Sequence, residues 1–338
     1  MDLDALSRDL VREGVAPTVA MGWARKAAGG AEWEVSVGGA TQAIFDLASV
    51  TKPITAMTFA RSGLDRRAPL RAHLPEAEGT PSADVSLELL LAHRAGLEAH
   101  ISVFAPLVEG RPFDRSAALM EALRARRAEC VGPVPAEGFP PVYSDLGYAL
   151  VGEVMRRRGV PPLDLGPELG PAAELRAAGV DFDGRVVPTE VVPWRGGEIR
   201  GEVHDENAWA LDGDRGSGHA GMFGTIEAVI RFGCTAHDAI ASEPELAWLV
   251  RPRPGGTLRA GFDGKSEEGS SAGTRCSPRT YGHLGFTGTS LWIDPDAKVV
   301  VALLTNRVHP TRDNVKIRAA RPRVHDALFA LAADRREG

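Results

Sequence analysis

Residues 45–56 constrain this chain more than any other stretch, because Ser49 and Lys52 lie three positions apart where an apolar run becomes helical. That spacing puts the hydroxyl and the amine on one face of a helix that starts at Ser49. Free N–H groups and the helix dipole favour negative charge at the start of a helix. Pro53 is compatible with this placement, because a proline is tolerated in the first turn. A serine becomes a nucleophile when a neighbouring base takes its proton and nearby donors receive the oxyanion. Taken alone, the pair equally fits an N-capping serine followed by a solvated lysine.

A second element is the triplet Tyr143-Ser-Asp145, which follows a stretch rich in proline and glycine at 131–141. The triplet is therefore expected on a loop that leads into an apolar helix. Asp145 can cap that helix and Tyr143 can pack in the core, which is a structural explanation for both. The functional alternative is that the Tyr143 hydroxyl relays a proton at Ser49 while Asp145 holds Lys52 in place.

A third element, residues 282–294, is a glycine-rich strand entry followed by alternating residues. Gly285 and Gly288 allow close approach of the backbone, which either a bound substrate or a β-bulge explains. The apolar run at 298–306 is typical of a central strand. The two segments therefore predict a hairpin that turns through Asp294-Pro-Asp, with His283 at the lip of a sheet.

In this order, the three elements resemble the serine β-lactamase and penicillin-binding-protein superfamily. Its members carry Ser-x-x-Lys, then Tyr-x-Asn or Ser-x-Asn, then Lys-Thr-Gly or His-x-Gly. The tyrosine in the second motif is similar to class C β-lactamases and their esterase and D-peptidase relatives. Residues 89–97 and 218–225 resemble two further family segments, so the resemblance covers nearly the whole chain from about Val19.

The resemblance implies a serine hydrolase that works through an acyl-enzyme on a small ester or amide, without a cofactor. Ser49 is then the acylated nucleophile, Lys52 its proton acceptor or electrostatic partner, and Tyr143 the base and later the acid. The implied oxyanion hole uses the amides of Ser49 and Phe286.

Two further positions are expected to support the site. Gly285 completes the third motif just before Phe286. His219 falls in the family-like segment at 218–225 and is expected to line the substrate site.

Two departures from the family pattern bear on the chemistry. Asp145 replaces the common asparagine, and a carboxylate beside Lys52 favours the protonated amine, which makes Tyr143 the better candidate for the base. His283 replaces lysine, and a histidine with a pKa of about 6.5 is mostly neutral at pH 7. Both changes favour esters or amides without an obligatory carboxylate.

Composition narrows the partners and the compartment. The 338-residue chain carries a formal charge of −6, which gives no basic surface for nucleic acid. Its first residues lack the parts of a signal peptide, and nothing approaches the ~20 apolar residues of a membrane span. The three cysteines are far apart, which suggests reduced thiols and no CxxC metal spacing. We expect a cytoplasmic enzyme with a small-molecule substrate and no membrane partner; the oligomeric state stays open, with a monomer favoured.

The expected fold is α/β of the α+β type, a mainly antiparallel sheet flanked by helices, as in β-lactamases and transpeptidases. Residues 1–60 and 215–338 are expected to form the sheet domain, and residues 61–214 an inserted, mainly helical subdomain, with the site in the cleft between them. The sequence predicts strands at 19–24 and 33–37 joined through 28–30, a helix at 227–232, strands between 281 and 305, and a final helix at 324–336.

Two rival functions stay open at this point. Two histidines among carboxylates can bind zinc, although the spacing matches no metal motif and a polar loop is the favoured interpretation. Asp145 and His283 also allow a binding module that keeps the fold without turnover. The residues of the zinc alternative are His204, Asp205, Glu206, Asn207, Asp181, Asp183, Asp212, Asp214 and His219.

Overall fold

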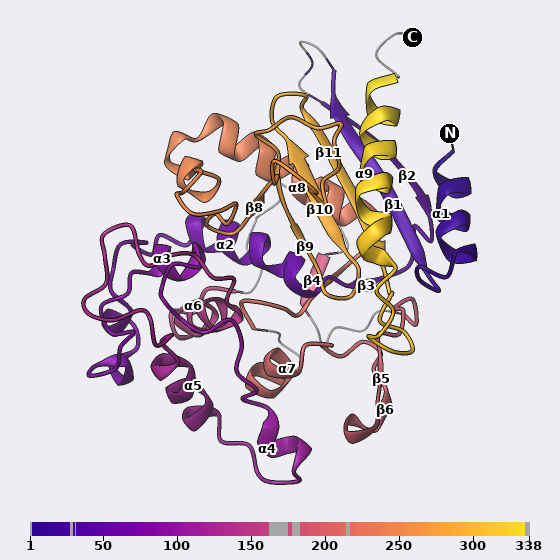
Figure 1. The fold of residues 1–338 in the computed structure, drawn as a ribbon. Coiled ribbons are helices and arrows are strands. Elements are labelled where there is room, and N and C mark those ends of the chain that lie inside the picture. Colours follow the sequence, from indigo (N-terminus) through magenta and orange to yellow (C-terminus); the bar gives the residue numbers. More distant parts are fainter. Residues whose placement is uncertain are drawn as a thin grey trace.

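The computed structural model describes residues 2–27, 30, 32–161, 175–177, 183–213 and 217–334. Its main feature is a sheet in the order β2-β1-β11-β10-β9-β8, with every neighbouring pair antiparallel (Figure 1). The strands are β1 (Val19–Lys26), β2 (Trp33–Gly39), β8 (Asp263–Gly264), β9 (Tyr281–Leu284), β10 (Ser290–Asp294) and β11 (Val299–Thr305). Both ends of the described chain therefore contribute to one sheet.

Helices cover both faces of this sheet. α1 (Leu3–Arg12) and α9 (Ile317–Asp334) pack on one face, and α8 (Ile226–Ser242) packs on the other (Figure 1). Alternate β1 residues divide between the two cores, with Met21 and Trp23 facing the α9 side and Ala20 and Ala24 the α8 side. Because both faces are covered, β11 is buried along its whole length and its sequence is continuously apolar.

The segment between β3 and β7 is mostly helix and loop. Its helices are α2 (Thr51–Arg61), α3 (Leu87–Leu91), α4 (Ala105–Val108), α5 (Arg115–Arg124), α6 (Asp145–Arg157) and α7 (Glu206–Asp212). Short strands complete two small sheets: β3 (Phe45–Asp46), β7 (Met222–Gly224) and β4 (Leu175–Ala177) in one, β5 (Val191–Val192) and β6 (Gly197–Glu198) in the other. The proposed boundaries of the helical insertion, at residues 61 and 214, stay a prediction.

The mainly antiparallel sheet flanked by helices is confirmed, as are the hairpin of β1 with β2 and that of β10 with β11. Residues 28 and 29 of the predicted first turn lie outside the described residues. Two helices are longer than predicted: α8 continues to Ser242, and α9 starts at Ile317 rather than at residue 324. Pro322 lies inside α9. A proline inside a helix removes one backbone hydrogen bond, so the residues before Pro322 do not show an ordinary helical pattern.

None of the helices within the described ranges combines the length and the apolar character needed to cross a bilayer.

Candidate active site

The Ser49 and Lys52 side chains meet at the junction of β3 and α2. Ser49 lies in a short 3₁₀ turn, Ala48–Val50, and α2 begins at Thr51, so the helix starts two residues later than predicted. The Lys52 ammonium is completely buried and donates to Ser49 Oγ over 2.9 Å. Ala48 just before the serine has a φ of 47°, in the left-handed region that residues other than glycine rarely adopt.

Asp145 is the ion-pair partner of Lys52, with Oδ1 accepting from Nζ over 2.7 Å. Of the two explanations that the sequence allowed for Asp145, the helix cap is wrong, because Ser144 occupies the N-cap position and Asp145 is the first residue of α6. Lys52 also donates to the His219 carbonyl over 3.2 Å. The three acceptors fix the ammonium beside the serine.

Tyr143 closes the cluster from the loop before α6. Its hydroxyl interacts with both Ser49 and Lys52, and Lys52 Nζ lies 4.9 Å from the centre of its ring. The structure thus brings Ser49, Lys52, Tyr143 and Asp145 together from two distant segments, as their predicted roles require.

The pKa values of Lys52, Asp145 and Tyr143 are all displaced from their usual values. Burial opposes the charged form of Lys52, but attraction to Asp145 and Tyr143 outweighs it and raises the Lys52 pKa above its usual value. Burial would likewise raise the pKa of Asp145, but Lys52 overcomes this and holds it below its ordinary value. Burial raises the pKa of Tyr143 despite the nearby ammonium. The resting state therefore holds an ammonium, a carboxylate and a neutral phenol.

A buried carboxylate that the sequence prediction missed supports the serine turn. Asp46 accepts from the Ala48 amide over 2.7 Å and from the His204 amide over 2.8 Å. Burial raises its pKa. Asp46 thereby connects the unusual backbone at Ala48 to the loop before α7. In the sequence, only its position three residues before Ser49 could have indicated a role at this site.

The turn between β9 and β10 is fastened directly to the serine turn. Thr287 Oγ1 donates to the Asp46 carbonyl over 2.8 Å, and Thr289 Oγ1 donates to the Leu47 carbonyl over 2.9 Å. A Cβ at Gly285 would lie 2.0 Å from Thr289 Oγ1 and 2.6 Å from the Leu47 carbonyl oxygen. The close approach predicted at Gly285 is thus made by the protein itself, through the Thr289 side chain and the Leu47 carbonyl.

We expect Gly285→Ala to push this turn away from Ser49. Overpacking of this kind costs about 1–3 kcal/mol of stability, and a shift of about 1 Å at a reacting group lowers kcat/KM about 100-fold. Urea unfolding and ester hydrolysis measure the two effects. Gly63→Ala is the control for catalysis alone: its Cβ would meet no atom within 4 Å and it should keep kcat/KM, although its φ of 74° makes an alanine there cost some stability. Unchanged catalysis in Gly285→Ala would contradict the proposed contact.

Phe286 lies within this turn, directly after Gly285, and is 49% exposed. Arg307 donates from Nε to the Phe286 carbonyl over 2.8 Å, and its guanidinium lies 4.5 Å from the Phe286 ring centre. His204 stacks on the same ring at 5.8 Å. Neither the Ser49 nor the Phe286 amide has a hydrogen-bond acceptor among the described residues. Neither N–H group is therefore occupied by an acceptor from the described part of the protein.

Two neutral histidines flank Tyr143. His283 Nδ1 donates to the Leu284 carbonyl over 2.8 Å, and burial together with repulsion from Lys52 lowers the His283 pKa to about 3. His93 stacks on Tyr143 at 4.7 Å and accepts from the Ser144 amide through Nδ1; burial and Lys52 lower its pKa to about 3. His93 was missed as a site residue, although it lies in the family-like segment at 89–97.

His219 contributes its carbonyl to Lys52, while its ring contacts Asp205 over 2.9 Å. His204 contacts Glu190 over 2.9 Å, and Asp212 pairs with Arg115. Within the described part of the chain, no three His, Cys, Asp or Glu side chains are grouped so that they could hold a metal. Asp181 and Asp214 of the zinc alternative lie outside that part. These contacts favour the interpretation of a hydrogen-bonded polar loop.

Comparison with known sequences gives the family. The model of the β-lactamase family matches residues 9–165 and 166–325, which is most of the chain. The chain belongs to the β-lactamase family. The family predicted from the three motifs is therefore confirmed.

This β-lactamase-family chain is 26% identical over 317 residues to an N-acetylmuramyl-L-alanine amidase of Bacillus subtilis, covering 80% of this chain and 69% of the relative. It is also 26% identical over 348 residues to a putative D-alanyl-D-alanine carboxypeptidase of Salmonella paratyphi A, covering 88% and 77%. The solved structure of EstCE1, described as a hydrolase with promiscuous acyltransferase activity, aligns with a TM-score of 0.69 at 19% identity over 97% of both chains. This likeness confirms the predicted fold.

Proposed function

We propose that this chain is a serine hydrolase that forms an acyl-enzyme at Ser49 on small esters or amides. The observation that carries the proposal is the cluster in which Lys52 contacts both Ser49 and Asp145 while Tyr143 contacts Ser49 and Lys52. Family membership and relatives named as an amidase, a carboxypeptidase and a hydrolase support the same class. A binding module without turnover is not favoured, because every group that the chemistry needs is present.

In the proposed reaction, Ser49 Oγ attacks the substrate carbonyl carbon and gives its proton to Tyr143. This step needs the form of the enzyme in which the Tyr143–Lys52 pair has lost one proton, with the Lys52 ammonium stabilising the phenolate. The carbonyl oxygen becomes an oxyanion that accepts from the Ser49 and Phe286 amides. Tyr143 then protonates the leaving group, and water attacks the acyl-enzyme by the same route to release the acid.

The charge of the pocket supports substrates without an obligatory carboxylate. His283 stands where family members often carry lysine, and with a pKa of about 3 it is uncharged throughout the neutral range. Asp145 adds a carboxylate, and its charge offsets that of Lys52. An ester or neutral amide therefore fits better than a substrate that needs a fixed cation.

Labelling with a fluorophosphonate tests the proposal directly. We expect one adduct per chain by intact mass, located on Ser49 by peptide mapping. A panel of p-nitrophenyl acetate, p-nitrophenyl butyrate, nitrocefin and a D-alanyl peptide then ranks the substrates, with the esters turned over fastest. Labelling at another residue, or no turnover of any ester above background, would defeat the proposal.

The pH dependence of kcat/KM should rise toward alkaline pH, because one proton must leave the Tyr143–Lys52 pair. In Asp145→Asn the carboxylate that raises the Lys52 pKa is gone, so the Lys52 pKa falls and the rise should move at least about one pH unit toward acid. Profiles from pH 5 to 10 measure the shift.

The matched control for this profile is His283→Gln. Its profile should keep the wild-type shape, since a group with a pKa of about 3 stays neutral over this range. An alkaline shift in Asp145→Asn would contradict the assignment.

We also propose that the protein resides in the cytoplasm as a monomer. Cys130, Cys234 and Cys276 are all buried and free, which suits a reducing compartment. Cell fractionation and gel filtration test the two statements, and recovery outside the cytoplasm or as a stable oligomer would contradict them.

A further inference from the structure

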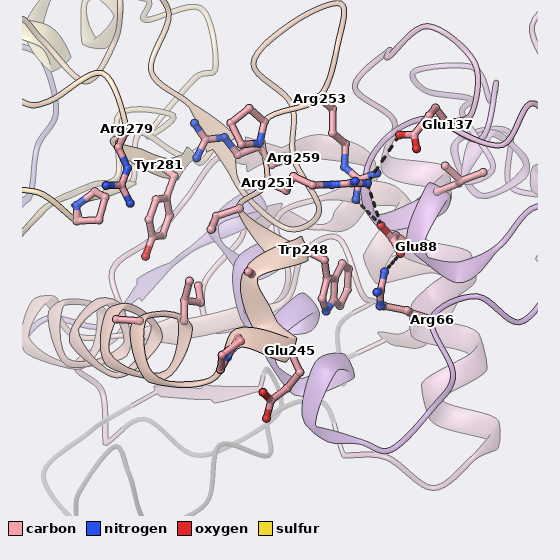
Figure 2. Close-up of a pocket in the computed structure, with 18 of the residues that line it drawn as sticks. Arg66, Glu88, Glu137, Glu245, Trp248, Arg251, Arg253, Arg259, Arg279 and Tyr281 are labelled. Atoms are coloured by element: carbon pink, nitrogen blue, oxygen red, sulfur yellow. Dashed lines mark hydrogen bonds and ion pairs between the residues drawn. The ribbon is translucent and has the colours of Figure 1, made fainter.

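A cavity of about 1160 Å³ lies apart from the cluster around Ser49 (Figure 2). It is bounded by α8, by the 3₁₀ turn at Pro244–Leu249, by the loop that follows this turn and by the start of β9. Ser49, Lys52, Tyr143 and His283 are not among its lining residues. We call it the arginine groove.

Cations dominate the lining of the arginine groove. Its basic residues are Arg66, Arg67, Arg251, Arg253, Arg259, Arg279 and Lys298, and its acidic residues are Glu88, Glu137 and Glu245. The chain as a whole carries a net charge of −6, so a basic lining here is a local concentration of positive charge.

Glu88 already neutralises one end of the groove. It forms ion pairs with Arg66 and with Arg253, the latter over 2.5 Å, and Arg251 lies 3.8 Å from it (Figure 2). Arg251 also lies 3.7 Å from Glu137. At this end of the groove the arginine charges are neutralised by Glu88 and Glu137, so an anion would gain little by binding there.

Arg259, in the middle of the groove, is compensated only at longer range. It is 8% exposed, and its guanidinium makes no hydrogen bond or ion pair with any residue that the structure describes. Asp263 attracts it electrostatically without pairing with it, and burial raises the Asp263 pKa. Burying an unpaired charge is costly unless a partner of opposite charge binds it.

Two more donors lie on the same wall as Arg259. Figure 2 shows Arg259, Arg279 and Tyr281 beside one another. The two guanidinium groups repel each other, and the Tyr281 hydroxyl lies within electrostatic reach of both. Tyr281 is 2% exposed and packs edge-on against Phe262, yet its hydroxyl has no hydrogen-bond partner among the described residues. Arg279 is exposed and is held by Asp296 over 2.9 Å.

We propose that the arginine groove binds the phosphoryl group of a small phosphorylated molecule through Arg259, Arg279 and Tyr281. Guanidinium groups match phosphate oxygens with paired N–H donors. A phosphoryl dianion presents three terminal oxygens in a tetrahedral array, which suits donors on three separate side chains better than the two coplanar oxygens of a carboxylate. The groove is large enough for the rest of such a molecule.

Calorimetric titration of the whole chain with inorganic pyrophosphate at low ionic strength tests the proposal. We expect one binding site in the wild type, and a loss of affinity of about tenfold or more in each of Arg259→Gln, Arg279→Gln and Tyr281→Phe. Succinate, a dicarboxylate, should bind more weakly than pyrophosphate. Ester turnover should be retained in Arg279→Gln, which shows that the loss of binding is not a loss of fold.

Arg12→Gln is the matched control. Arg12 is exposed and ion-paired with Asp9 much as Arg279 is with Asp296, with side-chain exposures of 77% and 74%, but it lies on α1 outside the groove. It should bind pyrophosphate like the wild type. Absence of binding in the wild type, equal affinity in Arg279→Gln and Tyr281→Phe, or tighter binding of succinate would each overturn the proposal.

Discussion

Ser49→Ala should lose labelling by a fluorophosphonate, and its kcat/KM for p-nitrophenyl butyrate should fall by at least about 10⁴-fold. The reason is that, among the described residues, only the Ser49 hydroxyl contacts both the Lys52 ammonium, at 2.9 Å, and the Tyr143 phenol. Only the two amides of the proposed oxyanion hole and substrate binding then remain to assist water. Steady-state kinetics and intact mass give the two readouts.

Ser242→Ala is the control for that experiment. Ser242 is exposed at the end of α8 and donates only to main-chain carbonyls of its own helix. It should keep both labelling and turnover. If Ser49→Ala retained a tenth of the wild-type rate, the acyl-enzyme would have to form elsewhere.

The second large effect is expected for Lys52→Met. Methionine fills a similar volume but removes the charge that Asp145 needs, so the variant should unfold about 3 kcal/mol more easily in urea. It should also lose about 10³-fold or more in kcat/KM, because no ammonium is left to stabilise a phenolate at Tyr143. Both effects follow from the completely buried position of Lys52 and its 2.7 Å contact with Asp145.

A double variant separates these two losses. In Lys52→Met/Asp145→Asn the uncompensated carboxylate is gone, so most of the lost stability should return while catalysis stays low. Recovery of turnover together with stability would mean that Lys52 serves only to hold the fold.

The grouping of Ser49, Lys52, Tyr143 and Asp145 could be predicted because these residues belong to two short motifs. Ser49 and Lys52 share one turn of chain, and Tyr143 and Asp145 stand two residues apart. The helix start was misplaced because a 3₁₀ turn and an α-helix share the same apolar pattern at 48–52. For Asp145 the sequence left a helix cap and a contact with Lys52 both open, and the buried lysine is the stronger partner for a carboxylate.

The missed residues act through contacts that span the chain. Asp46 and His204 meet across the gap between β3 and the loop before α7, and Thr287 reaches back to the Asp46 carbonyl. His93 supports Tyr143 by stacking, which leaves no periodic mark in the sequence. Gly285 was identified, but whether ligand or protein approached it depended on a tertiary contact with Leu47.

The position of β11 has a consequence for synthesis. This strand is inserted between β1 and β10, so Val19 pairs with Thr305 and Arg25 with Val299. On the ribosome, one edge of the β1–β2 hairpin therefore stays unpaired until residues 299–305 have emerged. A nascent chain arrested before residue 299 exposes an apolar strand edge, and we expect such intermediates to depend on chaperones and to aggregate when these are depleted.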